Sequence, residues 1–132
     1  MYAWILSKLF RSFKSNTKVP IKLEMFISFE GIEGSGKSTL LENLKNYYLK
    51  KDLEVLFTKE PGGTELGKVI RNILLDPTSL ITSEAELLLL MADRIEHVTT
   101  IINPNLKKNK MIFCDRYIDS TIAYQGKGRN LS

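Results

Sequence analysis

The fold is decided by the stretch Gly31-Ile32-Glu33-Gly34-Ser35-Gly36-Lys37-Ser38. It fits the pattern G-x-x-x-x-G-K-[ST], which is typical of a phosphate-binding loop, or P-loop. Its glycines allow the backbone to turn with N–H groups pointing inward, and a following helix adds the positive end of its dipole. Such a loop binds polyphosphate, because Lys37 reaches the terminal phosphates and the Ser38 hydroxyl can ligate Mg²⁺.

The segments on either side of this stretch support a P-loop. The preceding residues 25–29 (MFISF) are apolar and rich in aromatics, which predicts a buried strand. The alternative is a glycine-rich turn with a chance lysine, which needs neither a strand before it nor a helix after it. Apolar residues at helical spacing do follow the loop and predict a helix: Leu40, Leu41, Leu44, Tyr47 and Tyr48.

Composition limits the class of protein. The 132 residues have room for one modest domain with a core. The net charge of +4 is mild, and no basic run with interleaved aromatics favours nucleic-acid binding. The single cysteine, Cys114, excludes an internal disulfide and a multi-cysteine metal site. It lies in an apolar run, which predicts a small buried hydrophobe and fits a reducing cytoplasm.

Residues 1–24 differ from the rest of the chain. They are basic, with no acid before Glu24, and carry several aromatic and aliphatic residues. They could form an amphipathic segment lying on a membrane, an organelle transit peptide, or an extension upstream of a domain that begins at Met25. We favour the extension, with residues 25–132 as the folded domain. The apolar run before Lys8 is too short to span a membrane, so we expect no membrane partner.

After the first helix the pattern alternates again. Residues 54–58 predict a second strand, and residues 59–64 (KEPGGT) a rigid turn set by proline and glycines. A second amphipathic helix follows and stops near Asp76-Pro77. It is predicted from the helical spacing of its apolar residues, Leu66, Val69, Ile70, Ile73 and Leu74.

A third helix is predicted after this. Ser83 and Glu86 have the spacing of a capping box, and the apolar pattern then runs to Ile102, where Asn103-Pro104 is expected to interrupt it. The four leucines at 87–90 are typical of a core-facing segment.

Residues 111–115 (MIFCD) predict a buried strand that ends in an acid. Downstream of a P-loop this is the arrangement in which a central strand delivers a carboxylate, here Asp115, beside the metal. Any strand can end in aspartate, but Arg116 directly after it favours the functional interpretation. The alternation of strands and helices predicts an α/β P-loop NTPase fold, with a parallel sheet between two layers of helices.

A P-loop leaves switch GTPases, motor ATPases and small-molecule kinases open. Further motifs narrow this choice: residues 29–39 (FEGIEGSGKST), 58–64 (TKEPGGT), 115–121 (DRYIDST) and 123–126 (AYQG). Together they resemble the thymidylate kinase family, of bacterial type, from Met25 onward. The resemblance implies phosphorylation of dTMP to dTDP with ATP and Mg²⁺, in a cytoplasmic and generally homodimeric enzyme.

The resemblance also implies roles for single residues. Glu33 matches an acid that contacts the 3′-hydroxyl of the deoxyribose, and Arg71 an arginine that holds the dTMP phosphate. Arg94 matches the arginine that hydrogen-bonds thymine, and Arg116 one that bridges the phosphates. Arg71 and Arg94 also interrupt the apolar patterns of their helices, as cations facing a cleft would, although solvated arginines would do the same.

The expected site can therefore be stated in full. Lys37 and Arg116 are the expected catalytic residues, and Ser38 and Asp115 the expected metal ligands. The expected ATP-binding residues are Gly31, Ile32, Glu33, Gly34, Ser35, Gly36, Lys37, Ser38 and Thr39. The expected substrate-binding residues are Glu33, Lys59, Pro61, Arg71, Leu90, Arg94, Arg116, Ser120, Thr121, Tyr124 and Gln125.

Several positions depart from the family pattern. Lys59 stands where an arginine is usual, and Leu90 where a phenylalanine usually stacks on thymine; leucine can still pack there with some loss of affinity. Members of the family continue past the position of Ser132 into a mobile lid. The 1–132 chain is therefore expected to be a C-terminally truncated portion of such an enzyme. Because Gly34 leaves the P-loop without an arginine, this portion is expected to have no activity of its own. The alternative function is a non-catalytic nucleotide-binding fragment or interaction module.

Overall fold

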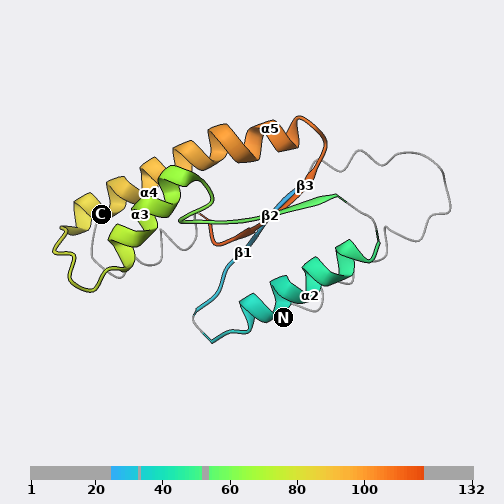
Figure 1. Ribbon diagram of the computed structural model, residues 1–132, viewed down its shortest axis with the longest axis horizontal. Helices are drawn as coiled ribbons and strands as arrows, with labels where there is room; N and C mark the ends of the chain where they lie inside the picture. The colour runs from blue at the N-terminus through green and yellow to red at the C-terminus, as the bar shows by residue number, and fades with distance from the viewer. Residues whose placement is uncertain (1–24, 33, 52–53, 118–132) are drawn as a thin grey trace.

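The computed structural model describes residues 25–32, 34–51 and 54–117. In this part of the chain a three-stranded parallel sheet has the order β1-β3-β2, so the last strand in sequence lies in the middle (Figure 1). Its strands are β1 (Met25–Phe29), β2 (Val55–Lys59) and β3 (Met111–Asp115). This order brings the end of β1, where the P-loop starts, beside the carboxylate that ends β3.

Helices cover both faces of the sheet, as the sequence predicted. Helix α2 lies on one side and the remaining helices lie on the other (Figure 1). Their bounds are α2 (Lys37–Leu49), α3 (Glu65–Leu75), α4 (Ser83–His97), the π-helical turn η1 (Val98–Ile102) and α5 (Asn103–Leu106). No helix in the described ranges has the length and apolar character needed to cross a membrane.

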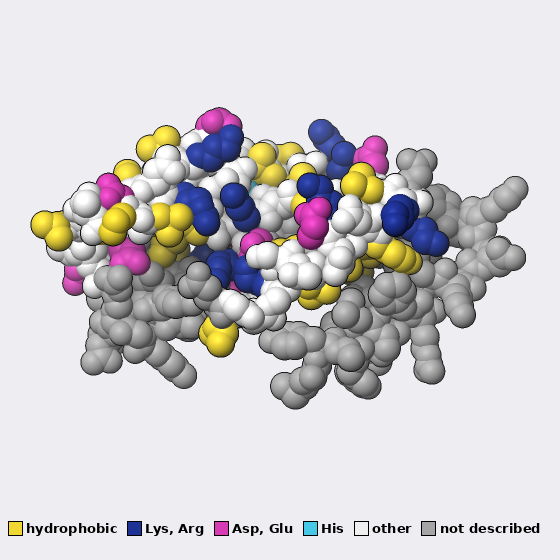
Figure 2. Space-filling model, turned by 60° about the horizontal axis from the view of Figure 1, so that its bottom comes forward, with side chains coloured by type: hydrophobic (Ala, Val, Ile, Leu, Met, Phe, Trp, Pro, Cys, Tyr) yellow, Lys and Arg dark blue, Asp and Glu magenta, His cyan; other side chains and the backbone are white. Residues whose placement is uncertain are grey.

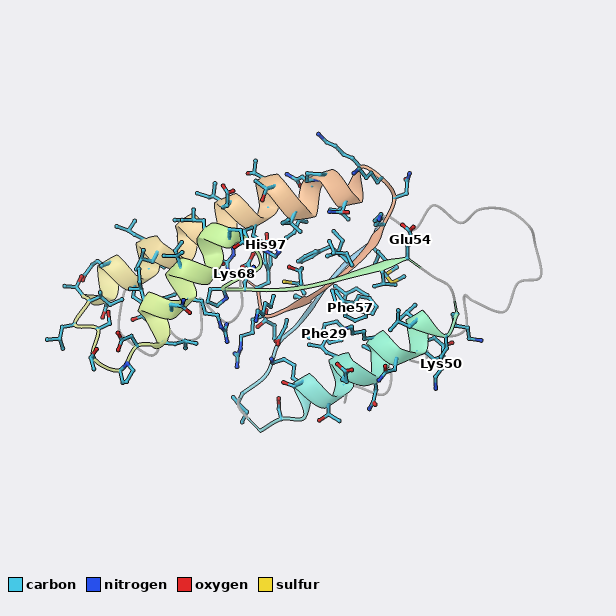
Figure 3. The ribbon with its side chains drawn as sticks, in the orientation of Figure 1. Phe29, Lys50, Glu54, Phe57, Lys68 and His97 are labelled. Carbon is cyan, nitrogen blue, oxygen red and sulfur yellow. The ribbon has the colours of Figure 1, made fainter. Side chains whose placement is uncertain are left out.

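The face of the sheet that α2 covers is apolar. Leu44 of α2 packs against Met111 and Phe113 of β3, all three of them buried. The rings of Phe29 and Phe57 meet Phe113 edge to face, with centroids 5.4 and 5.3 Å apart, and both lie between the sheet and α2 (Figure 3). Because side chains alternate along a strand, these residues of three neighbouring strands form one continuous core.

The opposite face of β3 is also buried. Ile112 and Cys114 are completely shielded from solvent, so the strand is covered on both sides. This explains why residues 111–114 form an unbroken apolar run instead of an alternating one. The prediction that Cys114 is a small buried residue is confirmed.

Some predicted boundaries were wrong. The second strand begins and ends one residue later than 54–58, at Val55–Lys59. The cap of α4 is Thr82, whose hydroxyl accepts a hydrogen bond from Ala85 N at 3.2 Å, so Ser83 is the first helical residue and not the cap. Both are threonine or serine followed by an acid nearby, which is why the pattern alone did not separate them.

Asn103-Pro104 does not interrupt the third helix. The chain passes from α4 through η1 directly into α5. The N–H of Asn103 bonds to the carbonyl of Val98, five residues back, and Pro104 then falls in the first turn of α5. Proline cannot donate a hydrogen bond to a carbonyl in the preceding turn, and the wider π-helical turn before it lets the helix continue past it.

The leucine run at 87–90 is not core. Leu88 is 69% exposed and the other three leucines are only partly buried. The buried residues of α4 are instead Asp93, Arg94 and His97. Helix α4 therefore presents polar side chains to the interior, because the turn that follows β2 lies opposite it.

Candidate active site

The P-loop has the geometry that phosphate binding requires. Gly34 and Gly36 have φ angles of 78° and 80°, in the left-handed region that favours glycine. The loop is closed by a hydrogen bond from Ser35 N to Ile32 O at 3.2 Å. Helix α2 begins at Lys37 without a side-chain cap, so its first N–H groups are available to an anion.

Lys37 forms an ion pair with Asp115. These residues are 78 positions apart, and they meet because β1 and β3 are neighbours with Phe29 opposite Asp115. A carboxylate and the Ser38 hydroxyl are hard oxygen donors of the kind Mg²⁺ prefers. Among the described residues no group of three or more metal-binding side chains occurs. Asp115 and Ser38 fit Mg²⁺, which commonly takes its other ligands from phosphates and water.

One cleft is lined by the P-loop, by residues of α3 and α4, and by the segments that follow β2 and β3. Its volume is about 810 Å³, within the range of small-molecule and cofactor sites. Lys and Arg side chains gather near the middle of the face shown in Figure 2. The residues that line the cleft are Ile32, Gly34, Ser35, Gly36, Lys37, Ser38, Thr39, Lys59, Glu60, Pro61, Arg71, Leu74, Leu75, Glu86, Leu90, Arg94, Asp115, Arg116 and Tyr117.

The turn after β2 supports Arg71. The guanidinium of Arg71 donates to the carbonyl of Pro61 at 3.0 Å. Gly62 has a φ of 108°, and a β-carbon on it would lie 3.0 Å from Arg71 Cδ. Glycine at this position therefore serves both the turn and the close passage of the arginine.

Several contacts hold the guanidinium of Arg94, which lies on α4 and lines the cleft. Its Nε donates to Glu60 Oε2 at 2.8 Å and one terminal nitrogen donates to the Tyr117 carbonyl at 2.9 Å. The guanidinium also lies over the Tyr117 ring, 4.8 Å from its centroid. Glu30 accepts from Tyr117 N at 2.7 Å, which fixes the start of the segment after β3. A cation held on several sides keeps its direction before any ligand arrives.

Burial alters the acidity of nearby groups. It raises the pKa of the Tyr117 hydroxyl, and the negative charge of Glu60 raises it further. It also raises the pKa of the Asp93 carboxyl, which accepts a hydrogen bond from Gly62 N at 3.1 Å. Cys114 has its pKa raised strongly by burial and by surrounding carboxylates. Its thiol stays protonated near neutral pH, which excludes it as a nucleophile.

The structure brings most expected site residues together. Every described one lines the cleft except Gly31, which makes room for Ser35, since a β-carbon there would lie 2.7 Å from Ser35 Oγ. The remaining expected residues, Glu33, Ser120, Thr121, Tyr124 and Gln125, lie outside the described residues.

The sequence interpretation missed other cleft residues. Glu60 and Tyr117 were inside quoted motifs but received no role. The only sequence signal for a buried acid at Glu60 was its position next to a turn rich in glycine. Leu74, Leu75 and Glu86 also line the cleft, and ordinary helical patterns hid them.

A strand, a glycine loop and a helix N-terminus, with an acid from the neighbouring central strand, define a P-loop nucleotide-binding protein. The family model described as thymidylate kinase matches residues 29–132. The chain belongs to the thymidylate kinase family.

Individual relatives agree with this assignment. The chain is 52% identical over 107 residues to the thymidylate kinase of Halothermothrix orenii, covering 81% of this chain and 52% of the relative. It is 54% identical over 108 residues to that of Acholeplasma laidlawii, covering 81% and 53%. A crystal structure of thymidylate kinase from Ehrlichia chaffeensis matches with a TM-score of 0.70 and 48% identity, covering 83% of this chain and 60% of that one. The chain thus spans about half the length of the curated relatives it matches.

Proposed function

We propose that this cleft binds Mg·ATP and dTMP and that the protein transfers the γ-phosphoryl group of ATP to dTMP, giving dTDP and ADP. One observation carries the proposal: the P-loop and three arginines, Arg71, Arg94 and Arg116, line the same cleft. Two phosphate-bearing ligands that must react need two sets of cations that face each other. The family membership supplies the identity of the acceptor.

The donor end acts through the P-loop. Backbone N–H groups of residues 34–39 and the N-terminus of α2 bind the phosphates of ATP, and Lys37 stabilises negative charge on the group being transferred. Lys37 leaves its ion pair with Asp115 to do so. Ser38 and Asp115 would hold Mg²⁺, which when bound neutralises phosphate charge.

The acceptor end acts through arginines and needs no general base. A phosphate monoester is already largely a dianion near neutral pH, so its oxygen can attack without losing a proton. Arg71 binds the dTMP phosphate and Arg116 bridges the two phosphate groups. Arg94 and Leu90, one helical turn apart on α4, bind the thymine base. The protein's contribution is alignment and charge stabilisation.

The experiment is a nucleotide titration followed by an activity assay. We expect calorimetry to show binding of dTMP and not of dCMP, and Arg71→Ala to weaken dTMP binding by about tenfold to 100-fold, the scale for a hydrogen bond to a charged group. Lys68→Ala is the matched control, because Lys68 lies one turn earlier on α3 and is exposed (Figure 3). Because the chain spans about half the length of its relatives, release of ADP that depends on dTMP is measured on the chain joined to the C-terminal segment of a relative, and it checks the reaction. Binding of ATP without binding of dTMP would contradict the proposal.

Homodimer formation through α3 and α4 is part of the same proposal. Each helix has apolar residues at i, i+3 and i+7 that are exposed by 37% or more: Leu66, Val69 and Ile73 on α3, and Leu88, Met91 and Ile95 on α4. Such stripes are typical of helices that pack against a partner. Light scattering after chromatography should show a dimer that Ile95→Glu converts to a monomer. A monomeric unchanged chain would contradict this part of the proposal.

A further inference from the structure

The one histidine of the sequence, His97, lies where the cleft is supported and not in the cleft itself. It is fully buried, with no exposed surface, and it is absent from the cleft lining. Its Nδ1 is 2.8 Å from Glu60 Oε1 and its Nε2 is 2.7 Å from Thr58 Oγ1. Figure 3 shows His97 on the side of its helix that faces the sheet. Its imidazole thus joins α4 to both the end of β2 and the turn that follows.

The partners of the imidazole dictate where its proton lies. The Glu60 carboxylate can only accept, so Nδ1 carries a proton and donates to it. The Thr58 hydroxyl can donate or accept, and it completes the chain at Nε2. Every polar atom of the ring is therefore satisfied without solvent, which a fully buried imidazole requires.

The backbone around the ring is shaped to admit it. A β-carbon on Gly63 would lie 2.7 Å from both Cδ2 and Nε2 of His97. The same pattern recurs one turn earlier on α4, where a β-carbon on Gly67 would lie 2.1 Å from Asp93 Oδ1. Gly63 of the turn and Gly67 of α3 thus leave the space that His97 and Asp93 of α4 occupy.

The two oxygens of Glu60 have different partners. Oε1 accepts from His97, while Oε2 accepts from Arg94 Nε at 2.8 Å. Rotation of the carboxylate about its terminal bond is a soft motion, and it would carry Oε2 away from Arg94. The His97 bond to Oε1 opposes that rotation, so the imidazole controls the orientation of a guanidinium that it does not touch.

We propose that His97 is a positioning residue: by fixing the Glu60 carboxylate it aims Arg94 into the cleft and so sets affinity for the nucleotide acceptor. The inference rests on the proposed function, since it takes the acceptor to be dTMP. The P-loop end of the cleft is built from backbone and does not depend on this chain of bonds. Loss of the His97–Glu60 bond therefore weakens acceptor binding and leaves donor binding unchanged.

Two substitutions separate the two ends of the imidazole. The amide nitrogen of asparagine is as many bonds from Cβ as Nδ1, and that of glutamine as many as Nε2. His97→Asn therefore keeps a donor to Glu60 and loses Thr58, whereas His97→Gln keeps the Thr58 contact and loses Glu60. Both change the same buried site and serve as controls for each other's effect on stability.

Calorimetric titrations of the 1–132 chain with dTMP and with Mg·ATP give the readout, after circular dichroism confirms that each variant is folded. We expect His97→Gln to weaken dTMP binding by about tenfold or more, the scale of supporting contacts that orient a binding group. His97→Asn should stay within about threefold of the unchanged chain, and Mg·ATP binding should change by less than about twofold in both. Equal dTMP binding by all three, or a parallel loss of both nucleotides, would overturn the inference.

A second measurement uses the unchanged chain and so does not require any variant to fold. With one histidine in the sequence, a ¹⁵N-histidine-labelled, tag-free chain gives a single imidazole signal set, and its long-range ¹H–¹⁵N spectrum reports which nitrogen carries the proton. A proton on Nδ1 is expected; an Nδ1 without a proton would overturn the inference. If the unchanged chain binds Mg·ATP but no dTMP, the proposed function fails and the inference fails with it, whereas equal dTMP binding by His97→Gln defeats the inference alone.

Discussion

The two faces of the sheet differ in the contacts that join them to the helices. Beneath α2, Phe113 meets the rings of Phe29, Tyr48 and Phe57 edge to face, with centroids 5.3 to 5.4 Å apart. On the side of α4, Thr58 and the buried Glu60 bond to His97. One face is held by apolar contact, whereas the other combines the buried Ile112 and Cys114 with a chain of hydrogen bonds.

This difference corresponds to the two ends of the cleft. The P-loop presents backbone N–H groups and needs only a rigid support, which an apolar core provides without directional constraints. The opposite wall presents side chains, whose direction depends on what each of them bonds to. We therefore expect changes on the α2 side to act mainly on stability and changes on the α4 side to act mainly on recognition.

The largest expected effect is on the apolar face. Phe113→Ala should lower the free energy of unfolding by about 3–5 kcal/mol, since it removes a ring that is 3% exposed and leaves a cavity. Denaturation by urea, followed by circular dichroism, measures this change. Leu49→Ala on α2, where the leucine is 70% exposed, is the control and should cost no more than about 0.5 kcal/mol. A loss below about 1 kcal/mol for Phe113→Ala would mean that this face is not the main core.

The next effect is on the donor end of the cleft. Lys37→Ala should reduce Mg·ATP affinity by about 100-fold, because it removes the cation of the loop and leaves Asp115 unpaired beside the phosphates. Isothermal titration calorimetry on the folded variant checks this. Lys45→Ala removes the same charge from an exposed position of the same helix and should leave the affinity unchanged. Unchanged binding by Lys37→Ala would refute the P-loop assignment.

A smaller effect, dependent on pH, is expected on the polar face. Burial raises the pKa of Asp93 above its usual value of 3.8, so the folded protein holds a proton that the unfolded chain has already released. The free energy of unfolding therefore falls as pH rises from about 3.8 through the raised value, and is constant above it. Asp93→Asn keeps an oxygen that can accept from Gly62 N but carries no charge.

The measurement is urea denaturation of both proteins across pH 4 to 7.5. The two chains differ only at Asp93, so the difference between the curves reports this carboxyl together with its interactions with Glu60, Arg94 and His97. The unchanged protein should lose stability relative to Asp93→Asn as pH increases. A gain in relative stability with increasing pH would show that hydrogen bonding from Gly62, and not burial, determines the pKa shift of the Asp93 carboxyl.

The smallest expected effect concerns Leu90 on the cleft wall. Leu90→Phe should tighten dTMP binding by no more than about 1 kcal/mol, the usual contribution of an aromatic contact beyond its buried area. Leu90 lines the cleft one helical turn before Arg94, which is the spacing that places both on one face of α4. Titration with dTMP measures the gain, and a weaker affinity would show that this wall does not contact the base. Leu80→Phe is the control, because Leu80 is 99% exposed and does not line the cleft.

Much of the architecture could be predicted from local pattern. The strands at 25–29 and 111–115 and the helix after the P-loop lie where the spacing of apolar residues placed them. Patterns near element ends were less reliable: Thr82 caps α4 in place of Ser83, and Pro104 does not end the helix. In both cases the position of the helix boundary depends on a single hydrogen bond, which the spacing of residues in the sequence does not predict.

The cleft was predicted unevenly for a physical reason. Lys37, Arg71, Arg94 and Asp115 carry charges at positions where an apolar pattern breaks or a strand ends, so the sequence marks them. His97 gave no such signal. A polar residue on a helix is ordinarily exposed, and only the residues opposite it make burial favourable.

Local sequence was sufficient for the phosphate-binding loop, the alternation of strands and helices, and the acid at the end of the central strand. These depend on glycine geometry and on periods of two and 3.6 residues, which are local properties of the chain. The joining of Glu60 to Arg94 and His97, which lie 34 and 37 positions away, instead required the folded chain. The stability of a buried polar group depends on the partner it meets, and that partner is chosen by the packing of α4 against the turn after β2.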